Sequence, residues 1–184
     1  MKINNIIRYM GAKDIDDRLI STITDEIALS DEIVPCIKQG CFDIKSTDED
    51  VIELINTDIK LKGNLAKRTF GDCKSIIVIF ATLTLKSELL LKSEFSKGGV
   101  NGVVLDAVLT EKLESELDKI EEGIRSSGKY TIVKNRISCG YGDLDIKIQK
   151  DLFYLLDCCS TGARINDEFM LYPNKSVIAL LGVK

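Results

Sequence analysis

The strongest constraint on the fold comes from residues 74–83, which read KSIIVIFATL and are apolar almost without interruption. A strand with one face in water alternates apolar and polar side chains, whereas this run is apolar at odd and even positions alike. It therefore predicts a strand that is buried on both faces. The run is far shorter than the roughly 20 residues that a membrane-spanning helix needs, so a protein core is its expected environment.

The clearest helical pattern lies at residues 103–124, where apolar side chains recur at every third or fourth position. This spacing places them on one face and predicts the longest helix of the chain, with an acidic opposite face. The apolar positions are Leu105, Leu109, Leu113, Leu117, Ile120 and Ile124, and the acidic ones are Glu111, Glu114, Asp118, Glu121 and Glu122.

Shorter elements are predicted along the rest of the chain. Asp14 and Asn64 are candidate N-terminal caps of two of the helices. Helices are expected at residues 4–10, 15–29, 65–70 and 85–95. Residues 32–44 are expected to be extended, and residues 46–50 to form a polar turn. The pattern at residues 51–59 fits either a strand or a helix. Two short strands, around residues 164–171 and 176–183, are close enough in sequence to form a hairpin.

The order of these elements favours an α+β fold. Strands and helices do not alternate regularly, which argues against a parallel sheet built from βαβ units. We expect a mostly antiparallel, twisted sheet with helices packed around it. The 184 residues are enough for one hydrophobic core and contain no internal repeat or linker, so a single domain spanning residues 1–184 is expected.

The residue types that are absent exclude several kinds of site. The chain contains no histidine, which excludes histidine-ligated zinc or haem and any catalytic triad that uses histidine. None of the six cysteines forms a Cys-x-x-Cys pair, and in a cytoplasmic protein we expect all six to be free thiols. The adjacent Cys158 and Cys159 are interpreted as buried packing residues rather than metal ligands, because structural ligands are normally spaced by two or more residues.

Charge and hydropathy limit the partners. The formal net charge is −4 and no dense cluster of Lys and Arg occurs, which disfavours a nucleic-acid partner. No apolar run reaches transmembrane length, and the N-terminus lacks the layout of a signal peptide. We therefore expect a cytoplasmic protein that binds neither nucleic acid nor membrane.

Residues 135–145, NRISCGYGDLD, combine several ligand-binding residue types in one turn. The turn follows a short β-type run at 130–133 and precedes an amphipathic helix near 146–156. Arg136 offers a forked, permanent positive charge that suits a carboxylate or phosphate. Gly140 allows close approach of backbone to a ligand, and Tyr141 adds a flat face and a hydroxyl. The alternative is an ordinary glycine turn with a surface arginine.

The C-terminal third, from about Arg136 to the end, resembles the activation (reactivation) domain of cobalamin-dependent methionine synthase. The first two thirds resemble free-standing members of that family more loosely. Ile137 and Cys139 stand where the family has prolines, and Ile178-Ala179 replaces its Ser-Gly. The matching motifs are Arg-x-Ser-x-Gly-Tyr-Gly-Asp at 136–143, a helix with Leu-Phe-x-Leu-Leu at 152–156, Thr-Gly-Ala-Arg-Ile-Asn-Asp-Glu-Phe-Met at 161–170, and Pro-x-Lys-Ser-Val at 173–177.

The resemblance implies an S-adenosylmethionine site at this turn and an antiparallel sheet surrounded by helices. It assigns Arg136 to the carboxylate of the ligand and Glu114 to its ammonium group. Glu168 would lie beside the ligand as a hydrogen-bonding residue. From the residues alone, Glu114 is more typical of a solvated helix face. The implied binding residues are Arg136, Ser138, Gly140, Tyr141, Glu114 and Ser176, with no catalytic residue.

The resemblance also implies a function in trans. The protein would support methionine biosynthesis as a component of a methyltransferase, helping to methylate cob(II)alamin reductively. Cobalamin would be carried by a partner methionine synthase or corrinoid protein, and a flavodoxin-like protein is a candidate electron donor. The histidine-containing cobalamin-binding motif cannot occur in this chain.

Two other functions stay open on the sequence. One is a non-catalytic binding or scaffold protein that keeps the fold but has lost the ligand, for which the departures at Ile137 and Cys139 speak. The other is an unrelated small enzyme that uses the carboxylates of Asp143, Asp145 and Glu168 for metal binding or acid–base chemistry.

Overall fold

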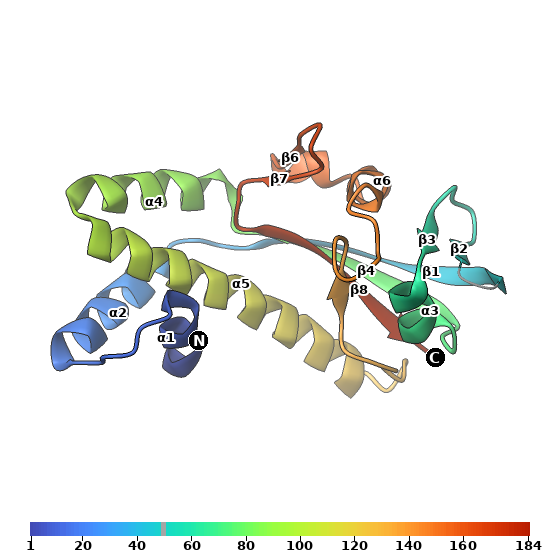
Figure 1. Ribbon diagram of the computed structural model, residues 1–184, viewed down its shortest axis with the longest axis horizontal. Helices are drawn as coiled ribbons and strands as arrows, with labels where there is room; N and C mark the ends of the chain where they lie inside the picture. Colours follow the sequence, from blue (N-terminus) through green and yellow to red (C-terminus); the bar gives the residue numbers. More distant parts are fainter. Residues whose placement is uncertain (49–50) are drawn as a thin grey trace.

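The computed structural model describes residues 1–48 and 51–184 and contains an α+β fold built on a twisted antiparallel sheet (Figure 1). The described residues form a larger sheet with the strand order β3-β2-β1-β4-β8-β5. A separate β6-β7 pair lies beside it. The strands of the larger sheet are β1 (Cys36–Asp48), β2 (Val51–Leu54), β3 (Lys60–Lys62), β4 (Ser75–Thr82), β5 (Ile137–Ser138) and β8 (Ser176–Val183).

Strand β4 lies at the centre of the sheet and is buried along its whole length, as the apolar run at 74–83 predicted. It pairs with β1 on one side and β8 on the other, both antiparallel. Successive side chains point to opposite faces, so Ile76, Val78 and Phe80 enter one core and Ile77 and Ile79 enter a second. The sheet therefore needs a covering layer on each face.

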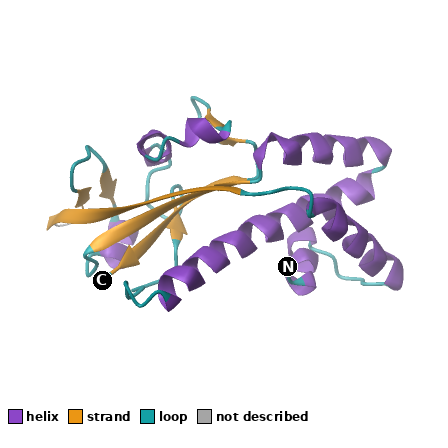
Figure 2. Cartoon of the chain, turned by 180° about the vertical axis from the view of Figure 1, so that it is seen from behind, coloured by secondary structure: helices purple, strands orange, loops and turns teal. Residues whose placement is uncertain are grey.

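Helices α5 (Gly99–Ser126) and α4 (Thr84–Lys97) provide the layer on the face of Ile77 and Ile79. Figure 2 shows α5 running diagonally across the sheet, with α4 folding back beside it. The predicted helix at 103–124 is confirmed and begins four residues earlier, at Gly99. Its apolar stripe supplies Leu105, Leu109, Leu113 and Leu117 to this core.

The first two helices extend this layer. Helices α1 (Ile3–Met10) and α2 (Asp17–Ser30) pack on the N-terminal half of α5, where Ile6 and Ile23 meet Val104 and Val108. The backbone N–H of Lys2 donates to Glu111 of α5 at 2.9 Å. This contact gives one buried acidic side chain of α5 a hydrogen-bond partner.

The opposite face of the sheet is covered by smaller elements. Helix α6 (Ile148–Leu155) buries Phe153, whose ring meets that of Phe80 edge to face at 5.9 Å between centroids. Helix α3 (Asn64–Phe70) buries Phe70 in the same core. Beside them lie a 3-10 turn, η1 (Cys158–Thr161), and the pair β6 (Arg164–Ile165) and β7 (Leu171–Tyr172).

Several local predictions are corrected. Helix α2 is capped by Asp16, whose side chain accepts from the N–H of Leu19, and not by Asp14. Residues 46–48 continue strand β1 instead of turning, while residues 49–50 of the predicted turn lie outside the described residues. The β-type run at 130–133 contributes only a single bridge, between Ile132 and Val183. The sequence left residues 51–59 open between strand and helix, and the structure shows that residues 51–54 form strand β2.

The predicted C-terminal hairpin is wrong in its pairing. Residues 164–165 pair with 171–172, whereas β8 enters the larger sheet between β4 and β5. The physical reason lies in the apolar character of β8, which is buried along most of its length and therefore fits a central position better than an edge.

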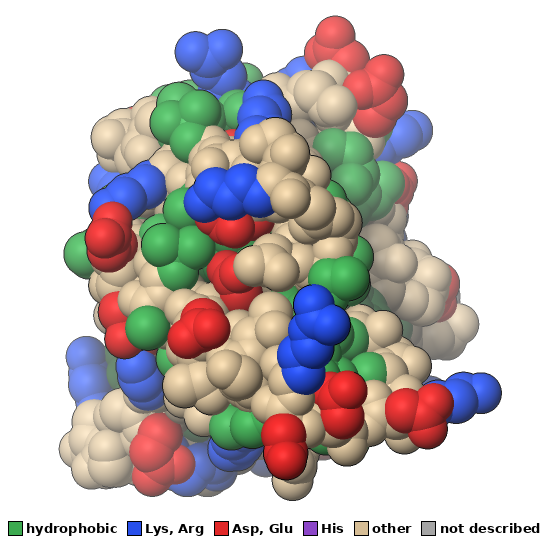
Figure 3. Space-filling model, turned by 90° about the vertical axis from the view of Figure 1, so that its left-hand side faces the viewer, with side chains coloured by type: hydrophobic (Ala, Val, Ile, Leu, Met, Phe, Trp, Pro, Cys, Tyr) green, Lys and Arg blue, Asp and Glu red, His purple; other side chains and the backbone are tan. Residues whose placement is uncertain are grey.

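Figure 3 shows the end of the molecule formed by the helices, where apolar and charged side chains are interspersed. Phe95, Val100 and Val103 are exposed near the α4–α5 junction. In the part of the chain that the structure describes, no helix is both long enough and apolar enough to cross a membrane.

Candidate functional site

Strand β5 positions the arginine of the turn. Its two residues pair with β8, Ile137 opposite Leu180 and Ser138 opposite Ala179. Because side chains alternate along a strand, Arg136 and Ser138 lie on the face opposite to Ile137. Ile137 packs against the core beneath α6, so Arg136 and Ser138 are directed toward α5.

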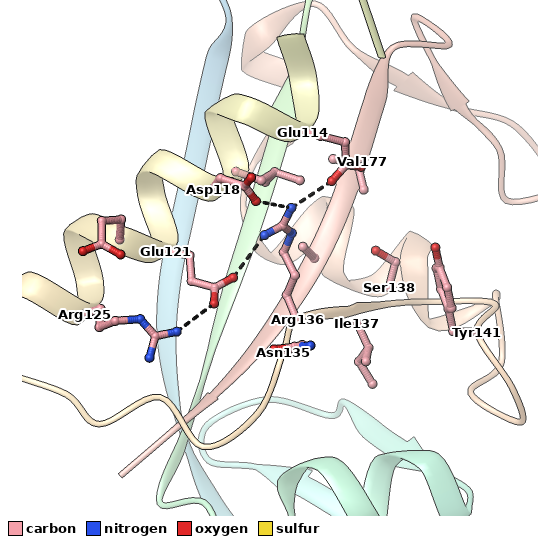
Figure 4. Close-up of a pocket in the computed structure, with 13 residues that line it drawn as sticks. Glu114, Asp118, Glu121, Arg125, Asn135, Arg136, Ile137, Ser138, Tyr141 and Val177 are labelled. Atoms are coloured by element: carbon pink, nitrogen blue, oxygen red, sulfur yellow. Dashed lines mark hydrogen bonds and ion pairs between the residues drawn. The ribbon is translucent and has the colours of Figure 1, made fainter. Parts of the chain in front are cut away.

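Helix α5 meets Arg136 with a stripe of carboxylates. Glu114, Asp118 and Glu121 follow one another at intervals of four and three residues, which places them on one side of the helix. Nη2 of Arg136 lies 2.8 Å from Oε2 of Glu114 and 2.8 Å from Oδ1 of Asp118. Nη1 lies 3.0 Å from Oε2 of Glu121. Figure 4 shows the guanidinium pointing into this row of carboxylates.

The surroundings of these groups differ. Glu121 also binds Arg125 at 3.1 Å and its side chain is only 16% exposed, so it is held from two sides. Asp118 is 61% exposed, and in the described part of the chain it contacts only Arg136 among cationic groups. Of the three carboxylates, Asp118 is therefore the one that can move away most easily.

The ion pairs fix the charge of Arg136. Burial alone would lower its pKa, but hydrogen bonds to Glu114, Asp118 and Glu121 outweigh that effect and raise the pKa above its ordinary value. Arg136 is consequently a permanent cation. It joins the turn to α5 in a geometry of charge-assisted hydrogen bonds, which are the stronger kind.

A cavity of about 620 Å³ opens around this cluster, between α5, β5 and β8. Its size is within the range of small-molecule sites. Val177 and Ala179 of β8 and Leu117 of α5 form its apolar part. The polar lining consists of Glu114, Asp118, Glu121, Glu122, Arg125, Asn135, Arg136, Ser138 and Tyr141, and Ile137 completes the boundary.

The turn after β5 closes one end of the cavity. Gly140 has φ of +85°, a conformation that side-chain-bearing residues rarely adopt, and its N–H donates to the carbonyl of Leu144. Tyr141 follows with 65% of its surface exposed at the rim. Burial raises the pKa of Cys139 to about 12, so this thiol is an inert packing residue beside the site.

The structure brings together four of the six residues selected from the sequence. Arg136, Glu114, Ser138 and Tyr141 all line the cavity, while Gly140 shapes the turn without lining it. Ser176 is placed differently, because its hydroxyl donates to Oγ1 of Thr82 on the neighbouring strand at 2.7 Å. Its neighbour Val177 lines the cavity instead.

Sequence analysis missed Asp118 and Glu121 as site residues. Both were assigned to the acidic face of the long helix, and neither was connected with Arg136. The signal that identifies them is their spacing from Glu114, because positions i, i+4 and i+7 share one face of a helix. Once Glu114 is placed near Arg136, the two others follow.

Two carboxylates of the small-enzyme hypothesis, those of Asp143 and Asp145, have structural roles. Asp143 accepts hydrogen bonds from the backbone N–H groups of Asn64 and Leu65 and so caps α3 from a distant part of the chain. Asn64, the predicted cap, is instead the first residue of α3, and Gly63 occupies the N-cap position. Asp145 accepts from the N–H of Lys147. Within residues 1–48 and 51–184, no group of three or more acidic or cysteine side chains is arranged to hold a metal ion.

The comparisons with known proteins give a match by structure and none by sequence. No protein-family model matches the sequence, and no curated protein matches it. A solved structure does match: the crystal structure of the MetH reactivation domain bound to AdoHcy, with a TM-score of 0.68 over 95% of this chain and 68% of the other. The two sequences are 15% identical. The predicted fold is thereby confirmed as that of a methionine synthase reactivation domain.

Proposed function

We propose that this protein binds S-adenosylmethionine in the cavity between β5 and α5 and acts as a reactivation subunit for a separate corrinoid protein. One observation carries the proposal. Four residues chosen from motifs far apart in the sequence, Glu114 on one side and Arg136, Ser138 and Tyr141 on the other, line a single cavity. The bound AdoHcy of the structurally similar domain differs from S-adenosylmethionine by one methyl group.

The lining residues offer a partner for each part of the ligand. The carboxylate of the ligand replaces Asp118 on Arg136, since Asp118 is the most exposed of the three paired carboxylates, and Asp118 stays in the lining of the cavity. The ammonium group binds Glu114, whose second oxygen is not used by Arg136. Tyr141 stacks on the adenine from the rim of the cavity.

The site holds and orients the methyl donor and needs no nucleophile of its own. In the proposed reaction a reduced corrinoid supplies the nucleophile, and it is carried by the partner because this chain has no histidine for a histidine-based cobalamin site. The contribution of the chain is to hold the methyl sulfonium in a defined position, which converts a chance encounter into an oriented one. On this proposal the protein works in the cytoplasm with its partner and with a flavodoxin-like or other one-electron donor.

One observation favours the alternative of a scaffold protein. Arg136 is paired with three carboxylates of the chain itself. In the scaffold alternative, this cluster has a purely structural role and holds the turn against α5, as many ion pairs do. The two functions differ in whether the cavity takes up a ligand.

Calorimetry distinguishes them. The protein is expected to bind S-adenosylmethionine saturably, and Arg136→Ala should weaken the affinity by about 10- to 150-fold, corresponding to roughly 1.5–3 kcal/mol for a hydrogen bond to a charged group. Tyr141→Ala tests the same cavity at an exposed position where the fold is not at risk. Lys129→Ala is the control, since Lys129 does not line the cavity. Absence of binding heat and of thermal protection at millimolar ligand contradicts the proposal and supports the scaffold.

A further inference from the structure

We propose that the cavity selects its ligand by positive charge, binding S-adenosylmethionine in preference to its demethylated product, with Asp118 and Glu122 as specificity-determining residues. This inference rests on the proposed function and deepens it, because it states which of two nearly identical ligands the site prefers. The two molecules share the adenosyl, ammonium and carboxylate groups. They differ only at sulfur, which is a cationic sulfonium in one and a neutral thioether in the other.

The charge of the lining gives the first argument. Four carboxylates, those of Glu114, Asp118, Glu121 and Glu122, face the cavity together with two guanidinium groups, those of Arg125 and Arg136, which leaves a net charge of −2. A cleft lined by one sign of charge concentrates its field in the opening and raises the local concentration of ligands of opposite charge. A net positive ligand is therefore favoured over a neutral one.

The arrangement of the ion pairs gives the second argument. Both arginines are already neutralised by carboxylates, Arg136 by three of them and Arg125 by Glu121. Neither presents an uncompensated positive charge that would repel a sulfonium. Glu122 has no ion-pair partner within the described residues, so its negative charge acts on the cavity without local compensation.

The third argument concerns the medium in which this field acts. Leu117, Val177 and Ala179 give the cavity an apolar portion, and these side chains reduce the water around a bound ligand. Charges interact more strongly where less water separates them. The preference therefore exceeds what the same carboxylates would provide on a flat, fully hydrated surface.

Selection by charge also suits the direction of the reaction. Methyl transfer to a reduced corrinoid breaks the sulfur–methyl bond, and the bonding electron pair remains on sulfur, so the positive charge leaves the ligand with the methyl group. The product is then held by a cavity whose charge no longer favours it. A site of this kind releases its product and takes up the next methyl donor.

Three ligands test the proposal by titration calorimetry at low ionic strength. S-adenosylmethionine is expected to bind about tenfold more tightly than S-adenosylhomocysteine, because its positive charge is attracted by a lining of net charge −2. Sinefungin, in which a protonated amine replaces the sulfonium, should bind like S-adenosylmethionine although it lacks the S-methyl group. High salt should reduce the preference, because it screens exposed charges.

Charge-neutral variants identify the residues responsible. Asp118→Asn and Glu122→Gln should each reduce the affinity ratio severalfold, and the double variant should bring it close to one. Any effect of Asp118→Asn on the ligand carboxylate cancels in the ratio, because both ligands carry that group. Glu116→Gln is the control on the same helix, since Glu116 pairs with Lys119 and does not line the cavity.

The outcomes separate this inference from the proposed function. If both ligands bind with equal affinity, or if sinefungin behaves like the thioether, selection by charge is wrong while ligand binding stands. An unchanged affinity ratio in the double variant also overturns it. If none of the three ligands binds, the proposed function fails and the selectivity fails with it.

Discussion

Arg136 has two roles that compete for the same atoms. Its guanidinium fastens the turn to α5 through Glu114, Asp118 and Glu121, and it is also the group that a ligand carboxylate would use. Five N–H donors allow both roles only in part. The exposed Asp118 resolves this competition, since its departure releases one contact of Nη2 while Glu114 still holds Nη2 and Glu121 holds Nη1. On the proposed function, the position for the ligand carboxylate on Arg136 is therefore already formed and is partly taken by Asp118.

Glu26, which does not line the cavity, shows the energetic cost of burying a carboxyl group. Glu26 of α2 is 3% exposed, and its Oε2 is the only buried side-chain nitrogen or oxygen in the described residues without a hydrogen-bond partner. Burial raises the pKa of Glu26, and repulsion by Glu94 adds to the effect, against opposition from Asn101 and Lys97. A carboxyl group with a raised folded-state pKa destabilises the fold once it ionises.

Glu26→Gln is therefore expected to increase the free energy of unfolding by about 1–3 kcal/mol at neutral pH, because it removes a buried negative charge that the folded state disfavours. The sign depends on pH. Below the unfolded-state pKa both states of the parent protein are protonated and the two proteins should be nearly equally stable. The difference grows as pH rises above the unfolded-state pKa, and it levels off above the raised pKa of the folded state. Urea denaturation from pH 4 to pH 8 measures it, and a gain independent of pH contradicts the assignment.

Single residues were predictable from the sequence where local chemistry determines their role. Arg136 and the glycine turn beside it were selected from local sequence alone, and the structure places Arg136 in the lining of the cavity and Gly140 in the turn that closes it. Ser176 was misplaced, because its hydroxyl finds a partner on an adjacent strand that no local pattern reveals. The capping of α3 by Asp143 was not predicted for the same reason, because Asp143 lies far from α3 in the sequence.

Helix α5 connects nearly every part of the molecule. One stripe packs on the sheet, its N-terminal half holds α1 and α2, and its C-terminal half carries the carboxylates of the cavity. It also packs closely against α4, where a Cβ built on Gly102 would lie 2.4 Å from Cδ1 and 2.5 Å from Cγ of Phe95. No heavy atom lies within 4 Å of the corresponding position at Gly123.

These two glycines of one helix form a matched pair. Gly123→Ala should stabilise the protein by about 0.5–1 kcal/mol, the usual gain when alanine replaces glycine in a helix. Gly102→Ala should lose that gain and destabilise by roughly 1–3 kcal/mol, because the Phe95 ring must shift. Chemical denaturation of both variants gives the comparison. Equal stabilisation by the two substitutions would show that α4 does not pack on α5 as described.

Elements with a long, regular apolar pattern were predicted well. The positions of strands that depend on which other strand they pair with were not. Strand β4 and helix α5 follow directly from apolar patterns over many residues. The position of β8 between β4 and β5 does not, because several pairings satisfy the same apolar run and only the packed sheet selects among them. Strand β5 has only two residues, too few to give any periodicity.

At the scale of the whole molecule, the cavity lies where the sheet ends. Strand β5 is the last strand of the larger sheet, and Tyr141 at the rim is exposed to solvent. A methyl group held there is accessible to a second macromolecule without a large rearrangement of the sheet.

The last prediction concerns the complete reaction in trans. A corrinoid protein loaded with cob(II)alamin is mixed with S-adenosylmethionine, a one-electron reductant and this protein, and recovery of methylcobalamin is followed by absorbance. The protein should accelerate recovery, because the reduced cobalt is short-lived and only a methyl group already positioned beside it can react before reoxidation. Arg136→Ala should fail through loss of ligand, whereas Lys129→Ala, outside the cavity, should behave like the parent. Tyr141→Ala should show an intermediate rate that excess ligand partly restores, since it weakens binding without breaking the ion pairs of α5. Recovery at the same rate with and without the protein would remove the reactivation role and leave the scaffold function in its place.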